Sequence, residues 1–441
     1  MYRLDKEIPM TVGRMDKYIT QHKAYDVRRM DKLLDYYMVK NKINRRSLES
    51  DTGLYHNRIA HPYASYITDI YVGYFMGEQV SYSAGEDDSK LLELLNGINA
   101  YNDEGATNAE LATDASIFGL GIELMYIDTD GKIRYKRIDP RQMMLIYDTS
   151  IEEELLYAIR YYVDADILTS ETTEYAEVYS AADIRRYRRT SSGLWVESES
   201  IPHAFGLVPI SPYFNNSATT GDFEQVISLI DAYDKAESDT LNDYSAFADA
   251  YLALKGMEGT EEEDLSALRR NKVLLLPTDG DAAWLTKNQS AEFVEALKTR
   301  LDKDIHKFAK CPAMTDEEFA GNASGVAMQY KLMGLETATS KKERAFRKGL
   351  QRRIELICNI LRVLTGQAYD YTSISMSFKR NLPANFSEIA DNLGKIGHLL
   401  SRETQVGLLP IDVDYAAEKE RLEAEAEEGY TLPEPAAGMV M

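Results

Sequence analysis

Apolar residues recur at helical spacing in three segments of the first 120 residues, at 14–40, 59–77 and 103–118. Side chains three and four positions apart lie on one face of a helix, so this pattern predicts amphipathic helices. In the second segment Pro62 fits the first turn and Gly77 fits the end, in line with residue preferences at helix termini.

Alternation of apolar and polar positions replaces the helical pattern after residue 118. Asp130-Gly131 separates two alternating runs, which is a strong signal for a β-hairpin. The stretch 201–221 is rich in turn-forming residues and is expected to be an irregular connection. Further strands are expected at 142–147, 156–163, 174–180, 183–189 and 194–198.

Long helical patterns dominate the second half of the chain. They cover 222–254, 290–310 and 326–365, and a compact insert with a predicted strand at 272–277 separates the first two. A strand at 373–380 precedes a helical tail. The predicted fold class is therefore α+β, mainly α.

The net charge of −22 comes from 72 acidic and 50 basic residues. Proteins that wrap nucleic acid tightly have a basic face, so this balance argues against stable wrapping. The segment 222–254 holds eight acids and one base, whereas 290–310 holds five bases and four acids. A single acidic helix is usually a solvated face. Two helices of opposite charge can instead pair between copies, so the pattern predicts self-association.

The sequence carries no recognisable motif for catalysis or cofactor binding. The chain has no GxxxxGK[ST] loop, and the glycines within 119–121 lack the third glycine of a dinucleotide fingerprint. The GNASG at 321–325 precedes a helical pattern, so Ser324 is expected to be an N-cap or loop residue rather than a nucleophile. Cys311 and Cys358 fit neither a disulfide framework nor a zinc motif. We expect no enzyme, cofactor or metal site.

The sequence also gives no sign of a membrane segment. No apolar run approaches the ~18 residues that a spanning helix needs. The opening MYRLDKEIPM lacks the apolar core of a signal peptide. We therefore expect no membrane partner.

An ordered series of blocks resembles portal proteins of tailed bacteriophages, of the siphovirus type common in phages and prophages of Gram-positive bacteria. The resemblance extends from about residue 30 to 384, and its most specific block is GNASGVAMQYKLMGLETATSKKERAFRKGLQRRIELI (321–357). Turns at 39–41 and 78–79 depart from the usual glycine-containing pattern. The other blocks are DYYMVKNKINRR (35–46), HNRIAHPYASYITDIYVGYFMGEQVSYS (56–83), FGLGIELMYIDTDGKIRYKRIDPRQMMLIYD (118–148), HAFGLVPISPYFNN (203–216) and FEQVISLIDAYDKAESDTLND (223–243).

The resemblance implies a portal fold with a fixed order of parts. It would make 1–221 the wing, 222–255 and 290–312 the two stem helices, 256–289 the clip, 313–324 the tunnel loop, 325–384 the spine helix with the wing's return strand, and 385–441 a helical crown.

The resemblance also implies a function. Portals are rings, usually of twelve subunits, at one capsid vertex, and double-stranded DNA passes through them during packaging and ejection. The implied partners are other copies of the chain, the DNA, the terminase large subunit, a head–tail adaptor, and the major capsid and scaffolding proteins. The implied location is the virion, after assembly in the cytoplasm of the bacterial host.

Three sets of site residues follow from the resemblance and the charge pattern. Stem residues expected at channel or subunit contacts are Asp231, Asp234, Glu237, Lys298, Lys303 and Lys307. Clip residues expected to dock the terminase or the adaptor are Glu261, Glu262, Glu263, Arg269 and Arg270. Tunnel-loop residues expected to face DNA are Asp316, Glu317, Glu318, Phe319, Asn322 and Ser324.

An acidic channel wall suits a moving duplex, because phosphates neutralised by Lys or Arg make DNA binding tight and salt-dependent. The basic stretch 341–362, with eight bases and two acids, is therefore expected at subunit contacts or on the outside of the ring. A DNA-gripping role for it is the alternative.

Two other functions stay open at this point. The first is a structural ring of another kind, such as a head-completion adaptor, although adaptors are generally much shorter. The second is a head-assembly enzyme such as a protease or nuclease, which would need a catalytic residue arrangement that the sequence does not display.

Overall fold

A computed structural model of the chain describes residues 2–46, 57–168, 171–248, 251–255, 281–285, 291–314, 325–381, 393–395, 397–407 and 415–427. These residues belong to two compact units, Met1–Arg380 and Asn381–Met441. The second unit contributes a short 3₁₀ turn (Gly397–Leu399) and two helices, α12 (Arg402–Gly407) and α13 (Tyr415–Glu427).

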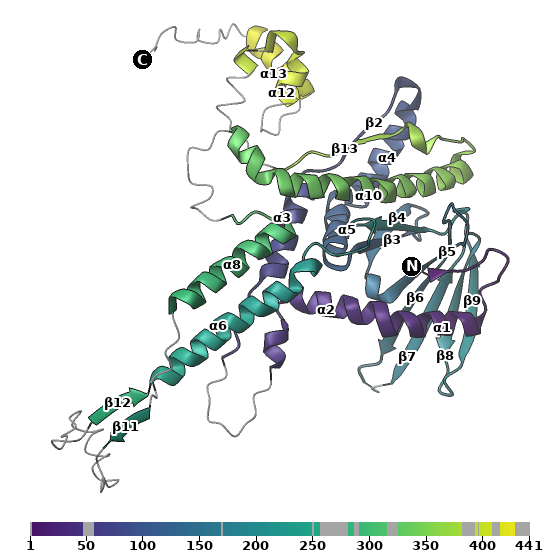
Figure 1. Cartoon of the computed structure of the whole chain (residues 1–441). Helices are drawn as coiled ribbons and strands as arrows, with labels where there is room; N and C mark the ends of the chain where they lie inside the picture. Colours follow the sequence, from purple (N-terminus) through teal and green to yellow (C-terminus); the bar gives the residue numbers. More distant parts are fainter. Residues whose placement is uncertain are drawn as a thin grey trace. The chain divides into compact units, whose positions relative to one another are not determined.

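A six-stranded sheet forms one side of the first unit (Figure 1). Its strand order is β1-β5-β6-β7-β8-β9, and only β1 pairs with its neighbour in parallel. Helix α1 packs on one face, where Met15 and Ile19 meet Ile159 and Val178 of the sheet. The strands are β1 (Tyr2–Arg3), β5 (Met143–Tyr147), β6 (Leu155–Ala165), β7 (Thr172–Tyr179), β8 (Asp183–Arg189) and β9 (Trp195–Pro202).

The N-terminal helical segment is continuous. Helix α1 (Val12–His22) passes through one π-helical turn at Lys23–Val27 into α2 (Arg28–Tyr37). The predicted helix over 14–40 is thereby confirmed, apart from its last residues. The backbone leaves the helix at Val39, whose φ is 58°.

A three-stranded sheet connects the larger sheet to the helices. Its order is β10-β3-β4, with β3 (Leu120–Ile127) and β4 (Ile133–Ile138) forming the predicted hairpin around Gly131. Strand β10 (Ile210–Phe214) lies in the stretch expected to be irregular, and it pairs with β3. It is an edge strand, so Pro212 can sit in it without removing a ladder hydrogen bond.

Long and short helices cover this smaller sheet. Helix α10 (Gly325–Thr365) confirms the predicted helix over 326–365 and crosses the unit beside β10 (Figure 1). Its residues Phe346, Leu350 and Ile354 share an apolar core with Leu91 and Leu95 of α4. The other helices described in this part of the chain are α3 (Tyr63–Met76), α4 (Ser89–Tyr101) and α5 (Glu104–Phe118), of which α4 was not predicted from the sequence.

Helices α6 (Ile227–Ala248) and α8 (Ala291–Ala309) lie side by side (Figure 1). The prediction of one helix over 222–254 is wrong at both ends. Residues 224–226 form a 3₁₀ turn, and Tyr251–Lys255 is strand β11, which pairs with β12 (Asp281–Leu285). The second predicted helix, at 290–310, is confirmed.

The return strand is shorter than expected. Only Ser375–Ser377 (β13) pairs, antiparallel to β2 (Ser81–Ser83). The predicted strand at 272–277 lies outside the described residues. None of the helices in the described ranges has the length and apolar character needed to span a membrane.

Candidate functional site

The helix pair α6–α8 is held together by an apolar base and an ion pair. Ile227 and Ile230 of α6 pack with Ile305 and Ala309 of α8 in one buried cluster. Farther along, Lys298 Nζ lies 3.2 Å from the Glu237 carboxylate, and it also contacts Glu295 on its own helix at 2.6 Å. Glu237 and Lys298 therefore already have partners within one copy of the chain.

An extended segment at 57–61 runs along α6 and is bound by side chains four residues apart. The Ser238 hydroxyl accepts the Ile59 N–H at 3.0 Å, and the Asn242 side-chain oxygen accepts the Asn57 N–H at 2.8 Å. At the next step along the helix, Asp234 accepts the His61 N–H at 2.9 Å. Residues i, i+4 and i+8 lie on one helix face, so α6 serves as a ladder of acceptors for an extended backbone.

Asp234 is the buried centre of this attachment. Its side chain has no exposed surface, and besides the His61 backbone it contacts the His61 ring at 2.9 Å. Asn41 Nδ2 donates to its other oxygen at 2.6 Å. Nearby, the Tyr36 hydroxyl donates to Asp231 at 2.5 Å. Burial and this carboxylate raise the pKa of Tyr36. Asp231 and Asp234 are thus engaged inside the chain.

Helix α8 is attached through α3 in the same way. The Tyr63 hydroxyl donates to Asp302 at 2.6 Å, and burial and Asp302 raise the pKa of Tyr63. The rings of His61, Tyr63 and Tyr233 meet edge to face or tilted, with centroids 4.7 to 6.2 Å apart. Both helices are therefore fixed at their base by aromatic and carboxylate contacts.

The surface of the helix pair carries exposed apolar side chains. Phe293 and Leu297 on α8 are 69% and 42% exposed, and Tyr244 and Leu241 on α6 are 76% and 38% exposed. Lys303 and Lys307 of α8 are exposed too, and the described residues offer neither of them an ion-pair partner. Helix α8 therefore carries exposed apolar groups together with positive charges that the described residues do not neutralise.

A buried charge network fixes α10 to the small sheet and to α5. Arg353, 1% exposed, donates to Glu123 at 3.0 Å, to Glu104 at 3.2 Å and to Asn108 at 2.8 Å. Its guanidinium also lies over the Tyr135 ring, 4.3 Å from the centroid. Burial raises the pKa of Glu123, and Arg353 opposes this rise. Each nitrogen of the Arg353 guanidinium thus has a hydrogen-bond partner, which a buried charge needs.

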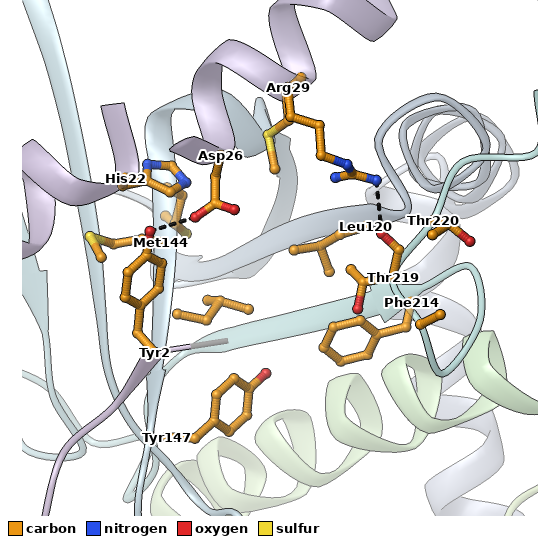
Figure 2. A pocket seen from close by; sticks show the side chains of 14 residues that line it. Tyr2, His22, Asp26, Arg29, Leu120, Met144, Tyr147, Phe214, Thr219 and Thr220 are labelled. Carbon is orange, nitrogen blue, oxygen red and sulfur yellow. Dashed lines mark hydrogen bonds between the residues drawn. The ribbon is translucent and has the colours of Figure 1, made fainter. Parts of the chain in front are cut away.

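A cavity of about 320 Å³ lies between the π-helical turn, β5 and the loop after β10 (Figure 2). Arg29 spans one wall by donating to Glu224 at 2.7 Å and to the Thr219 carbonyl at 3.0 Å. Tyr2 donates to Asp26, and His22 bonds the Tyr161 hydroxyl at 2.7 Å. The titratable side chains Tyr2, Asp26 and His22 are thus hydrogen-bonded within the protein. This favours a structural role for them over proton transfer to a ligand.

Chemistry of other kinds finds no support in the described part of the chain. No group of three potential metal ligands occurs among those residues. Cys311 and Cys358 are free, buried thiols. Burial raises the pKa of each to about 12, which disfavours the reactive thiolate.

The structure thus places one of the three predicted site sets. The stem residues come together on α6 and α8, where Asp231, Asp234, Glu237 and Lys298 are engaged internally and Lys303 and Lys307 are exposed. The tunnel-loop residues 316–324 and the clip residues 261–270 lie outside the described residues. The acceptor ladder on α6 was missed, although the spacing Asp234, Ser238, Asn242 was visible in the sequence.

Comparison with known proteins gives three matches. A family model described as "Phage portal protein, SPP1 Gp6-like" matches residues 16–430. A portal protein of Bacillus phage SPP1 is 27% identical over 421 residues, covering 88% of this chain and 82% of that protein. A portal protein of Clostridium phage phiCD119 is 26% identical over 416 residues, covering 90% and 87%.

Proposed function

Because the chain belongs to the SPP1 Gp6-like family of phage portal proteins, we propose that it assembles into a closed ring of identical subunits at one vertex of the capsid. In this proposal α6 and α8 form the stem around a central channel, and double-stranded DNA passes through it during packaging and ejection. The ring is expected to have twelve subunits.

The observation that carries the ring is the exposed apolar face of α8. Phe293 and Leu297 are four positions apart, so they lie on one face of this helix, and they are 69% and 42% exposed. Exposed apolar side chains that share a helix face mark an interaction surface. In a head-to-tail ring each copy covers this surface of the next, so all copies are satisfied at once.

Ion pairs within one copy reduce the number of charged stem residues that can contact a second copy. Lys298 and Glu237 neutralise each other in one copy. Of the predicted stem bases, Lys303 and Lys307 are therefore the ones available for charged contacts between copies. Surface pairs of this kind are worth only about 0–1 kcal/mol each. The apolar contacts therefore supply most of the stability of the proposed ring, and the charges set its register.

The DNA path follows from the family and from the overall charge. At −22 the chain has little capacity to grip phosphates, so the duplex stays mobile in the channel. We propose that loop 313–324 lines the narrowest part. We further propose that 256–289 docks the terminase large subunit during packaging and a head–tail adaptor afterwards, while the outer surface contacts capsid and scaffolding proteins.

In this proposal the protein is a structural part of the virion with no catalytic activity of its own, and it is assembled in the cytoplasm of the host. The motor ATPase is a separate subunit, in keeping with the lack of a phosphate-binding loop in the sequence.

The ring is tested by sedimentation velocity and negative-stain imaging of the purified chain. We expect a particle near twelve times 49.9 kDa with a central hole. The double variant Phe293→Ser, Leu297→Ser should dissociate it, because it makes the exposed α8 surface polar. Lys235→Ser, a change of an exposed residue on the other helix, serves as the control. A wild-type monomer at micromolar concentration would contradict the proposal.

A further inference from the structure

The bases of the stretch 341–362 divide into two groups. Four of the eight are ion-paired inside the chain, Lys342 with Asp222, Arg347 with Glu343, Arg352 with Glu355, and Arg353 with Glu123. The side chains of the other four, Lys341, Arg344, Lys348 and Arg362, are exposed and have no ion-pair or hydrogen-bond partner among the described residues. We call the first three of these, Lys341, Arg344 and Lys348, the basic stripe.

The basic stripe lies on a single face of α10. Residues 341, 344 and 348 are three and four positions apart, which puts them on one side of the helix. The opposite side carries Phe346 and Leu350, which are fully buried. Toward the start of α10 the exposed face continues with Tyr330 and Met333, which are 73% and 62% exposed. The whole face is open to solvent in one copy.

A complementary acidic surface lies on the other side of α10. Glu86, Asp87 and Asp88 form a 3₁₀ turn directly before α4, and their carboxylates have no partner among the described residues. We call them the acidic turn. Lys90 follows the acidic turn and hydrogen-bonds Gln367. With three acids and one base, residues 86–90 have a net charge of −2. The first residue of the turn is separated from β2 by only Ala84 and Gly85.

The acidic turn and the basic stripe belong to elements on different sides of the α10 core. Leu91 and Leu95 of α4 pack in the same core as Phe346 and Leu350 of α10. Helix α4, and with it the acidic turn, is therefore on the buried side of α10, and Figure 1 shows α4 behind α10. A ring requires two different patches of one chain that are complementary and fit together head to tail.

We propose that the basic stripe of one copy docks on the acidic turn of a second copy. This inference rests on the proposed ring and adds one of its contact surfaces and its direction. Three positive charges meet three negative charges at every interface, and Tyr330 and Met333 supply an apolar edge. Such pairs contribute mainly to orientation and association rate, and they weaken as salt screens them.

The test is a charge reversal with a charge swap. The variant K341E/R344E/K348E puts like charges at each interface. In 0.1 M salt, where the Debye length is about 10 Å, we expect its apparent association constant to fall at least about tenfold, which corresponds to about 1.4 kcal/mol. In 1 M salt, where the Debye length is about 3 Å, most of this loss should disappear.

The swap identifies the partner surface. The variant E86K/D87K/D88K should lose assembly in the same way, and the chain that carries all six changes should assemble again because the charges are once more opposite. K17E/R28E/K40E makes the same change in net charge at exposed positions within residues 17–40 and should assemble like the wild type. Circular dichroism and sedimentation velocity monitor folding and assembly of each variant.

Each failure has its own meaning. A wild-type chain that stays monomeric contradicts the proposed function itself. Wild-type rings together with K341E/R344E/K348E rings of equal stability at low salt overturn the inference alone. The inference is also overturned if the six-residue swap folds but does not recover assembly. Intact rings of the reversed variant with weaker binding to duplex DNA would assign the basic stripe to phosphates instead.

Discussion

Asp234 joins three parts of the chain through one fully buried carboxylate. It accepts hydrogen bonds from Asn41 and from the backbone and ring of His61. A buried carboxylate costs free energy unless its lone pairs are satisfied, and here the partners come from segments almost 200 residues away in sequence. The residue is therefore expected to serve stability rather than the channel surface.

Asp234→Ala should lower the free energy of unfolding by about 3 kcal/mol, because it leaves the His61 N–H and one N–H of the Asn41 amide without an acceptor, while the other keeps the His61 carbonyl. Urea unfolding followed by circular dichroism measures this. Asp239→Ala on the same helix is the matched control, since Asp239 makes only a partly exposed pair with Arg46 and should cost about 0–1 kcal/mol. Equal costs for the two variants would contradict the role given to Asp234.

His22 predicts a loss of stability in acid. Burial lowers its pKa to about 4, and the nearby Asp26 only partly offsets this. Above the ordinary value of 6.5 the residue is neutral whether folded or unfolded. Below it the unfolded chain binds a proton that the folded chain refuses until about pH 4, so folding weakens as the pH falls through this window, by up to about 3 kcal/mol.

His22→Asn should flatten this dependence, because the variant lacks the buried imidazole that resists protonation in this window. The measurement is the unfolding midpoint of wild type and variant between about pH 7 and about pH 5, the range in which an ordinary His changes charge. A difference between the two proteins that stays constant across this range would mean that another group controls the acid response.

At the scale of elements, the contact between α10 and β10 is unusually close. A Cβ placed on Gly349 would lie 2.5 Å from the Tyr213 ring and 2.8 Å from the Pro212 carbonyl oxygen. Tyr213 is completely buried, so neither side can move freely. Glycine at 349 thus allows the helix to lie directly on the edge strand, and the Arg353 network fixes the same helix one turn later.

Gly349→Ala should therefore push α10 away from β10 and destabilise the fold by about 2–4 kcal/mol, as overpacking of a core does. Gly334→Ala on the same helix is the control. A Cβ there meets nothing closer than 3.8 Å, and alanine favours the helix by up to about 1 kcal/mol. Thermal unfolding of both variants decides the matter, and a neutral Gly349→Ala would refute the close contact.

At the scale of the whole molecule, the proposed channel calls for a test of loop 313–324. Changing Asp316, Glu317 and Glu318 together to Lys should leave rings intact but arrest DNA packaging part-way. The reason is that twelve copies would place at least thirty-six positive charges around the duplex, and each phosphate contact slows its movement. Arrest should be most severe at low salt.

Packaging assays with purified heads and motor, scored by the length of protected DNA, measure this effect. The control is E7K/E78K/E152K, which makes the same change in net charge at exposed positions outside the stem and the loop. Normal packaging of full-length DNA by the triple Lys variant in low salt would place the narrowest contact elsewhere, most plainly on the stem helices.

The sequence by itself determined the elements whose signal is local. The 3.6-residue period was enough to locate α8 and α10, and Asp130-Gly131 was enough to locate the β3–β4 hairpin. The ordered blocks also pointed to the portal family, which the match over residues 16–430 confirmed. These features depend on neighbours in sequence, so their physical cause is contained in a short window.

Only the tertiary structure decided the features that depend on distant partners. The end of α6 and the start of β11 are set by pairing with β12, and β10 exists because β3 offers it a partner. In the sequence, nothing distinguishes Asp234 from the other acids of its helix. Its burial and its hydrogen bonds to Asn41 and His61 appear only in the folded chain. Long-range pairing and burial decide such cases, because the free energy of a strand or a buried charge comes from groups that no local window contains.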